Sequence, residues 1–161
     1  MSKGFAAFLI VVLSISLFVC ISAMVLSWIR RLRKEAIANL RQDVGEEKVY
    51  QVNDCNFFGV SSSGYGQIRG NGVLALTEKG LHFRMLAPRK YLFIPLDSIR
   101  EVSHPRWFLG KSKARMLLRV DFFNQDEEKD AAAWLVHNHE WWGKAILDMR
   151  AGMEPPPHPT Q

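Results

Sequence analysis

The chain has 161 residues, of which 48% are hydrophobic and 23% are charged, and its formal net charge is +5. This length allows one ordinary domain with an appendage and excludes a large multidomain enzyme. An aromatic content of 11% and ordinary numbers of Gly and Pro exclude a disordered or collagen-like chain, and two cysteines are too few for a disulfide framework or a thiolate metal site.

The first predicted element is a transmembrane helix within residues 1–29. No residue from Gly4 to Ile29 is charged, and this run exceeds the length of about 20 residues that a helix needs to cross a bilayer. A cleavable signal peptide would have a shorter apolar region of about 7–15 residues followed by small residues. Because this run ends instead in Trp28 and Ile29, we expect an uncleaved membrane anchor.

The charges beside this run predict its orientation. Lys3 precedes the run nearly alone, whereas four cations follow it directly. Lys and Arg beside a span tend to stay in the cytoplasm. We therefore expect a single-pass protein of the plasma (inner) membrane, with its N-terminus outside and its C-terminal domain in the cytoplasm. The residues expected to contact lipid at this juxtamembrane position are Trp28, Arg30, Arg31, Arg33 and Lys34.

The net positive charge does not predict nucleic-acid binding. Six of the 21 Lys and Arg residues lie at or before Arg41, with only one of the 16 Asp and Glu residues. The rest of the chain therefore carries equal numbers of both charges, whereas a domain that binds a duplex needs a basic face. We expect a membrane among the partners and no nucleic acid.

Small side chains form a ridge on the predicted span. They recur at spacings of four, three and four residues, at Ser16, Cys20, Ala23 and Ser27. Such a ridge lets two helices approach closely, which predicts a homodimer. The alternative is that the serines only bond to a backbone carbonyl one turn earlier.

A helical linker is predicted over residues 30–49. Leu32, Ala36, Ile37 and Leu40 keep helical spacing in a stretch rich in Arg, Lys, Glu and Ala, which favour helices. Gly45 is a suitable place for this helix to stop.

A strand-rich domain is predicted over residues 50–152, because the hydrophobic period there changes to two. Apolar and polar residues alternate in the segments 81–85 and 118–122, as in antiparallel strands with one buried face. Turn residues separate the strands, and Gly80 suits a left-handed position in one of these turns. This pattern indicates a small barrel or sandwich.

The end of this domain is predicted to be an amphipathic helix. Asn138 suits the N-cap, and Trp142, Ile146 and Met149 fall on one helical stripe. The segment 126–136 is ambiguous, because its composition favours a helix whereas the sheet needs one more strand. Residues 153–161 are rich in proline and are predicted to form an extended, mobile tail.

Several segments carry a resemblance to a known family: Gly72 to Thr77, then Gly80, Leu81 and Phe83, then Ile94 to Leu96 with Ile99 and Val102. Together they resemble the GRAM-like branch of the PH-domain-like superfamily. The resemblance implies a mainly β (α+β) fold, a seven-stranded bent barrel with a C-terminal capping helix. It makes 131–136 the last strand and 139–150 the helix. It also implies a binding module rather than an enzyme.

One departure from the family pattern concerns the first hairpin. Phosphoinositide-binding members of the superfamily have a basic cluster there, whereas this chain has Ser61 to Gly66 with only Arg69 nearby. A polyphosphate headgroup would find few cations at that position.

The candidate binding surface is an inter-strand loop that mixes cations with aromatic residues. Its residues are Arg106, Trp107, Phe108, Lys111, Lys113 and Arg115. Aromatic side chains can enter the headgroup zone of a membrane while Lys and Arg pair with lipid phosphate. The alternative is that Trp107 and Phe108 complete the core and the cations form a solvated turn.

Other constellations have simpler explanations. Gly64, Gly66 and Gly70 lack a P-loop lysine, which favours tight turns over nucleotide binding. His137, His139 and Glu140 fit a corner between a strand and a helix, with no remote third metal ligand. We therefore expect no metal, no cofactor and no catalysis.

The predicted function is a membrane-tethered cytoplasmic adaptor that recognises an anionic lipid surface or a membrane protein. The alternative is a small accessory subunit of a membrane transporter or envelope-assembly complex, in which the folded domain is only a scaffold.

Overall fold

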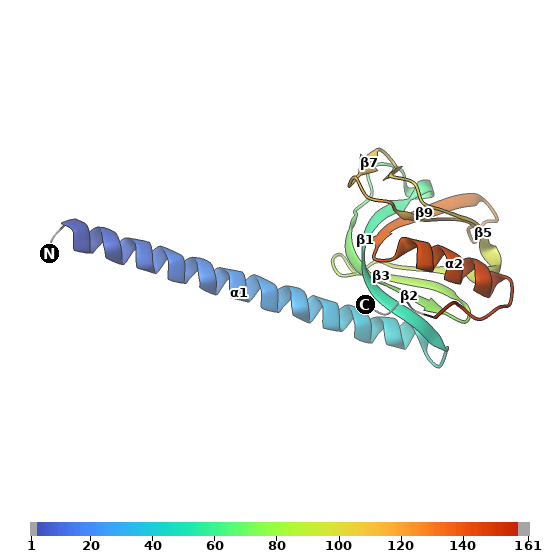
Figure 1. The fold of residues 1–161 in the computed structure, drawn as a ribbon, viewed down its shortest axis with the longest axis horizontal. Helices are drawn as coiled ribbons and strands as arrows, with labels where there is room; N and C mark the ends of the chain where they lie inside the picture. Colours follow the sequence, from blue (N-terminus) through green and yellow to red (C-terminus); the bar gives the residue numbers. More distant parts are fainter. Residues whose placement is uncertain (1–2, 158–161) are drawn as a thin grey trace. The chain divides into compact units, whose positions relative to one another are not determined.

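The computed structural model describes residues 3–157 (Figure 1). The first element is the 42-residue helix α1 (Lys3–Val44). The chain divides into two compact units, residues 1–35 and 36–161, so the last part of this helix belongs to the second unit.

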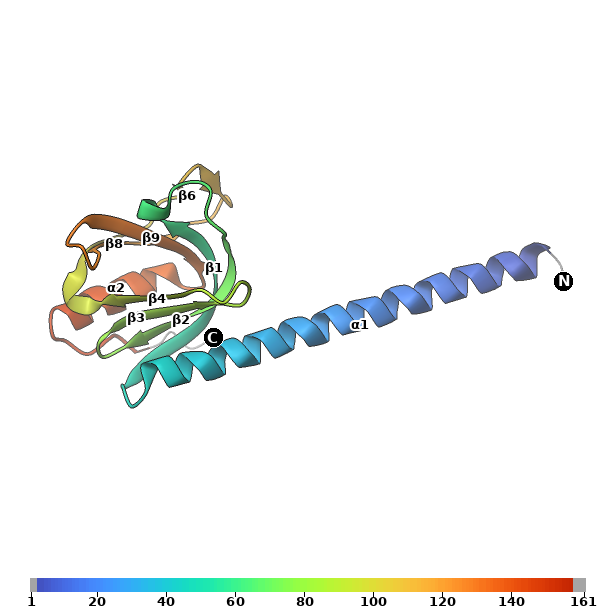
Figure 2. The ribbon, with the colours of Figure 1, turned by 180° about the vertical axis from the view of Figure 1, so that it is seen from behind.

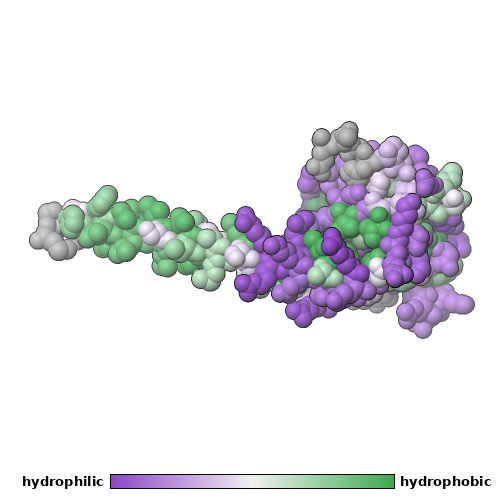
Figure 3. All heavy atoms as spheres, turned by 90° about the horizontal axis from the view of Figure 1, so that it is seen from below, coloured by the Kyte–Doolittle hydropathy of each residue, from purple (hydrophilic) through white to green (hydrophobic). Residues whose placement is uncertain are grey.

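The first unit contains the apolar part of α1 and the charged residues that follow it up to Glu35. Among the described residues, one helix is long and apolar enough to cross a membrane. Its most apolar stretch of 18 residues has a mean hydropathy of 2.9, and none of that stretch is buried inside the protein. Figure 3 shows hydrophobic side chains along most of this segment and hydrophilic ones after it. The predicted helix is confirmed, whereas its insertion into a membrane stays a prediction.

The second unit is built on one antiparallel sheet of seven strands (Figure 2). In the order in which they pair, they are β4 (Tyr91–Pro95), β3 (Gly80–Met85), β2 (Gly70–Thr77), β1 (Val49–Val60), β9 (Lys129–Val136), β8 (Leu118–Phe123) and β5 (Ile99–Ser103). Two 3-10 turns, η1 (Ser61–Ser63) and η2 (Leu96–Ser98), connect strands. The mainly β (α+β) class is confirmed. The sheet does not close into a barrel, because β4 and β5 stay at its two edges.

Helix α2 (His139–Arg150) covers the main core of this unit. Trp142 and Ile146 are fully buried in that core and Met149 packs against it, which confirms the predicted stripe. The predicted N-cap position is confirmed, but the capping hydrogen bond expected of its side chain is not formed. Asn138 occupies the N-cap in a left-handed conformation with φ of 54°, and its side chain makes no capping hydrogen bond.

The ambiguous segment 126–136 ends in the strand β9, not in a helix. Ala132 and Trp134 face the main core, while Ala131 and Ala133 face a second cluster on the opposite side of the sheet. Both faces of the strand are therefore buried, and long-range packing outweighs the helical propensity of its alanines.

The end of α1 packs on the outer face of the sheet. Ala36, Leu40 and Val44 are buried against Val73 and Ala75 of β2. These three helical residues are four positions apart, so they lie on one face of the helix. The predicted linker 30–49 therefore does not act only as a connection, because its second half belongs to the folded unit. Gly45 ends the helix in a left-handed conformation, as predicted.

A polar cluster lies next to this contact. Glu47 accepts a hydrogen bond from Thr77 Oγ1 at 2.7 Å, and its carboxylate lies 3.3 Å from His82 Nε2. His82 Nδ1 lies 2.8 Å from the hydroxyl of Tyr91. The neutral imidazole with its proton on Nε2 satisfies both contacts. His82 is only 2% exposed, so the expectation that polar residues of segment 81–85 face solvent is wrong for it.

We expect the free energy of unfolding of fragment 34–161 to fall as the pH decreases from 7.5 to 5.5. Burial lowers the pKa of His82, and the carboxylates of Glu47 and Asp43 oppose this effect only in part. The unfolded chain therefore binds a proton near pH 6.5 that the folded chain does not, and stability is lost below that pH at up to about 1.4 kcal/mol per pH unit.

Denaturant unfolding at several pH values checks this prediction. His82→Gln should flatten the pH dependence. His139→Gln is the control for a second histidine whose pKa burial also lowers. If the free energy of unfolding of His82→Gln depended on pH as strongly as that of wild type, the prediction would be contradicted.

The turn between β2 and β3 differs from its predicted conformation. Thr77 Oγ1 accepts hydrogen bonds from the backbone N–H groups of Lys79 and Gly80, at 3.3 and 3.2 Å. Gly80 is not left-handed. A side chain is excluded there because a Cβ atom would lie 2.2 Å from the carbonyl oxygen of Ile94 on β4.

The described part of the tail makes specific contacts. Trp141 Nε1 donates to the carbonyl oxygens of Pro156 and Pro157 at 3.1 and 3.2 Å. Lys48 lies 3.5 Å from Glu154. Residues 154–157 of the predicted tail therefore contact the folded unit, the mobility of the tail stays a prediction, and residues 158–161 lie outside the described residues.

Candidate functional site

The predicted binding loop contains a short hairpin between β5 and β8. Its strands are β6 (Trp107–Phe108) and β7 (Lys111–Ser112), and Trp107 pairs with Ser112. Leu109 and Gly110 form the connection with positive φ values of 46° and 71°. Two residues with positive φ suit the tight turn of a two-residue hairpin. We call residues 106–115 the basic hairpin.

The two adjacent aromatic residues of the basic hairpin point to opposite sides. Trp107 is 66% exposed, whereas Phe108 is 5% exposed and packs with Phe58 and Leu117 on the outer face of the sheet. Successive side chains on a strand face opposite ways. Phe108 therefore anchors the hairpin on the domain, and its predicted contact with a ligand is corrected to this supporting role.

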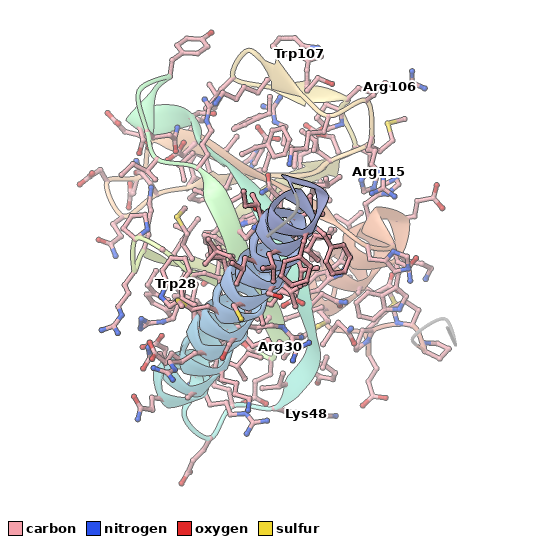
Figure 4. All side chains as sticks on the ribbon, turned by 90° about the vertical axis from the view of Figure 1, so that its left-hand side faces the viewer. Trp28, Arg30, Lys48, Arg106, Trp107 and Arg115 are labelled. Atoms are coloured by element: carbon pink, nitrogen blue, oxygen red, sulfur yellow. The ribbon has the colours of Figure 1, made fainter. Side chains whose placement is uncertain are left out.

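The charges of the basic hairpin are accessible and of one sign. The sequence of the basic hairpin contains no Asp or Glu. Its four cations are all exposed: Arg106, Lys111, Lys113 and Arg115. Figure 4 shows Trp107 and Arg106 reaching outward from the hairpin. This surface has the composition of a membrane-contacting loop, with an amphipathic aromatic ring among cations.

Tyr65, in the loop between β1 and β2, adds a second aromatic side chain that sequence reasoning missed. It is 74% exposed, and a Cβ placed on Gly110 would lie 3.3 Å from its ring. Ile68 in the same loop is 60% exposed. Tyr65 lies between two glycines in a polar segment. An aromatic residue in a polar loop is the sequence feature that could have indicated an exposed binding residue.

A pocket of about 380 Å³ lies between the basic hairpin and the start of β2. Its cations are Arg69, Lys111 and Lys113, and none of its nine described lining residues is acidic. Arg69 Nη2 donates to the carbonyl oxygen of Leu109 at 3.3 Å, whereas its Nε is buried without a hydrogen-bond partner. The fold thus brings Arg69 to the hairpin cations from a position about 40 residues earlier in the chain.

The other predicted site residues lie on α1. The helix-pairing residues Ser16, Cys20, Ala23 and Ser27 are exposed, as are Trp28, Arg30, Arg31, Arg33 and Lys34. Figure 4 shows Trp28 and Arg30 on this helix. Ser14, on the same helix, bonds to a backbone carbonyl one turn earlier, which is the alternative role of such serines: its Oγ donates to the carbonyl oxygen of Ile10 at 2.8 Å. Helix pairing and lipid contact stay predictions.

The histidines near α2 form an aromatic contact. The rings of His104 and His139 meet edge to face, with centroids 4.9 Å apart. Burial lowers the pKa of His139, and the neighbouring charge of His104 lowers it further. Within residues 3–157, no group of three or more His, Cys, Asp or Glu side chains is arranged to hold a metal ion.

Comparisons with known proteins give a similarity in fold. No protein-family model matches the chain, and no curated protein matches it. A similar solved structure is the C-terminal domain of an unknown protein from Leishmania infantum, with a TM-score of 0.53 and 13% sequence identity. The match covers 73% of this chain and 97% of that domain. At this identity the likeness concerns the fold alone.

Proposed function

We propose that this protein is a membrane-tethered, PH-like binding module that docks on an anionic lipid surface through its basic hairpin. The observation that carries the proposal is the exposed pair Trp107 and Tyr65 beside four exposed cations without an acidic residue among them. In this proposal the apolar part of α1 is the anchor, its N-terminus is outside, and the folded unit is cytoplasmic.

The PH-like part of the proposal is supported by strand order and by the C-terminal helix. Strands β1 to β4 follow one another across the sheet, and the chain then continues on the other side of β1 with β5, β8 and β9. Helix α2 follows the last strand and covers the core. These features agree with the resemblance in residues 72–102, although the sheet is open.

Physical chemistry favours a lipid surface as the occupant. Each Lys or Arg near an anionic leaflet contributes about 1 kcal/mol, and indole rings prefer the headgroup level. An anchor on the same chain keeps the domain at a high effective concentration beside the bilayer. Weak affinity of the isolated hairpin is therefore sufficient for docking in the intact protein.

Flotation of fragment 34–161 with vesicles tests the proposal. We expect it to bind phosphatidylcholine vesicles that contain phosphatidylserine, and to be released by salt. Charge reversal by Lys111→Glu, Lys113→Glu and Arg115→Glu together should weaken binding by about 100-fold or more, because three favourable terms of about 1 kcal/mol are lost. Trp107→Ala should weaken binding while keeping its salt dependence.

A matched control separates this surface from net charge. Arg100→Glu, Lys129→Glu and Lys144→Glu together change the charge equally at exposed positions outside the basic hairpin. Binding of wild type that only the hairpin variant loses supports the proposal. Equal loss in both variants, or no binding at any lipid composition, contradicts it and favours a membrane protein as the occupant.

A further inference from the structure

The proline-rich tail occupies a surface made by the first turn of α2 and the residue before β1. Trp141 Nε1 donates to the carbonyl oxygens of Pro156 and Pro157, and Lys48 lies 3.5 Å from Glu154. We propose that Trp141 and Lys48 form a binding site for a proline-rich segment of a partner protein, and that the chain's own tail occupies this site until the partner displaces it. The inference goes beyond the proposed function, because neither residue belongs to the basic hairpin.

The tail has the sequence of a segment that aromatic sites bind through its backbone. Residues 155–157 are three consecutive prolines. Proline fixes φ at about −65° and favours an extended conformation of the residue before it. Such a segment forms a polyproline II helix, whose carbonyl groups have no hydrogen-bond partner within the helix. The indole of Trp141 contacts two of these carbonyl oxygens, at 3.1 and 3.2 Å. It therefore recognises acceptors that any segment of this conformation presents.

A left-handed residue directs the tail back along α2. Gly152 has a φ of 76°, and the N–H of Met153 donates to a backbone carbonyl oxygen in the last turn of the helix at 2.9 Å. Figure 1 shows the chain turning back after α2 and running beneath it. Trp141 and Arg150 are nine positions apart on the helix, which is about 14 Å, and five residues of polyproline II span about 15 Å. The tail is therefore long enough to reach the first turn of α2.

The fold positions Trp141 independently of the tail. Its side chain packs against the main core. Its ring meets the ring of the fully buried Trp142 edge to face, with centroids 5.7 Å apart. Because the indole is already held in one place, little conformational freedom is lost when a ligand binds to it. The donor of the site therefore stays in position when the tail leaves.

The ion pair selects the ligand but holds the tail only weakly. Lys48 Nζ lies 4.6 Å from the centroid of the Tyr50 ring. The side chains of Lys48 and Glu154 are 58% and 84% exposed, and a pair so exposed contributes little to affinity. It favours a segment with an acidic residue directly before its prolines, as in 154–157. A partner with this sequence pattern presents the same groups and can exchange with the tail.

Calorimetric titration with a synthetic peptide that has the sequence of residues 153–161 tests the inference. The full chain in detergent micelles is compared with a chain that ends at Gly152. We expect the shortened chain to bind the peptide saturably. Wild type should bind it at least tenfold more weakly, because the attached tail competes at a high effective concentration. No saturable binding to the shortened chain, or equal binding to both chains, overturns the inference.

A variant of full length makes the test independent of whether the shortened chain folds. Pro155→Gly, Pro156→Gly and Pro157→Gly together keep the length of the tail and remove its stiffness. A flexible tail loses more conformational freedom on binding and competes less well. This variant should therefore bind the peptide several-fold more tightly than wild type, and cooperative thermal unfolding shows that it is folded. A folded variant with the same peptide affinity as wild type overturns the inference.

Substitutions in the shortened chain connect peptide binding to the two site residues. Trp141→Phe keeps an aromatic ring and removes the Nε1 donor, so it should weaken binding by about two- to tenfold, the effect of one hydrogen bond. Lys48→Glu should also weaken binding, and a peptide with Glu154→Lys should restore it. Lys129→Glu is the matched charge control at an exposed position on β9 and should leave the affinity unchanged. Unchanged affinity in both Trp141→Phe and Lys48→Glu overturns the inference.

Discussion

Replacing Leu40 by alanine is expected to lower the free energy of unfolding of fragment 34–161 by about 2–5 kcal/mol. Leu40 is 2% exposed and packs on Val73 and Ala75 of β2, although it belongs to the helix that begins in the apolar segment. The variant removes buried apolar surface and leaves a cavity between the helix and the sheet. Denaturant unfolding followed by circular dichroism measures the change.

The control for Leu40→Ala is Arg41→Ala, at an exposed neighbouring position on the same helix. Its effect should stay within about 0.5 kcal/mol. A truncated fragment that begins at Asp43 should be less stable than either variant, because it lacks both Ala36 and Leu40. Equal stability of the fragments that begin at residues 34 and 43 would show that the end of α1 does not stabilise the sheet.

The difference between linker and domain was partly visible in the sequence. The apolar residues of segment 36–44 keep helical spacing, and β2 contains an uninterrupted apolar run from Val73 to Leu76. A strand with such a run is buried on both faces. The two observations together predict that an apolar helix face packs on the outer face of β2. Local periodicity alone does not identify which segment covers β2, since the contact joins residues about 30–40 positions apart.

The strands and α2 followed from local patterns, because periods of two and 3.6 have a direct physical cause. The outcome for segment 126–136 depended instead on its neighbours in the sheet. The candidate site shows the same division. Exposure of the hairpin cations was predictable from their charge, whereas the opposite placements of Trp107 and Phe108 depend on which face of β6 meets the domain. The meeting of Arg69 with that hairpin depends on tertiary structure.

Replacing Gly72 by alanine is expected to lower the free energy of unfolding by about 1–3 kcal/mol, which is the usual cost of overpacking a core. A Cβ atom on Gly72 would lie 2.3 Å from the ring of Phe83 and 2.6 Å from the carbonyl oxygen of Arg84. That ring is fully buried and stacks on Phe57, with centroids 4.6 Å apart. The carbonyl oxygen belongs to the backbone of β3, which pairs with β2, so making room for the Cβ atom disturbs the pairing of these two strands.

Gly66→Ala is the matched control for Gly72→Ala, because a Cβ atom at Gly66 meets nothing within 4 Å and its φ is not positive. Its stability should change by less than about 0.5 kcal/mol. Thermal unfolding of fragment 34–161 compares the two variants with wild type. Both glycines belong to the same glycine-rich stretch of sequence, so a difference between them isolates the close approach of β2 and β3. Equal stability of the two variants would mean that Phe83 can repack, and the stacked aromatic core would then be less rigid than its geometry indicates.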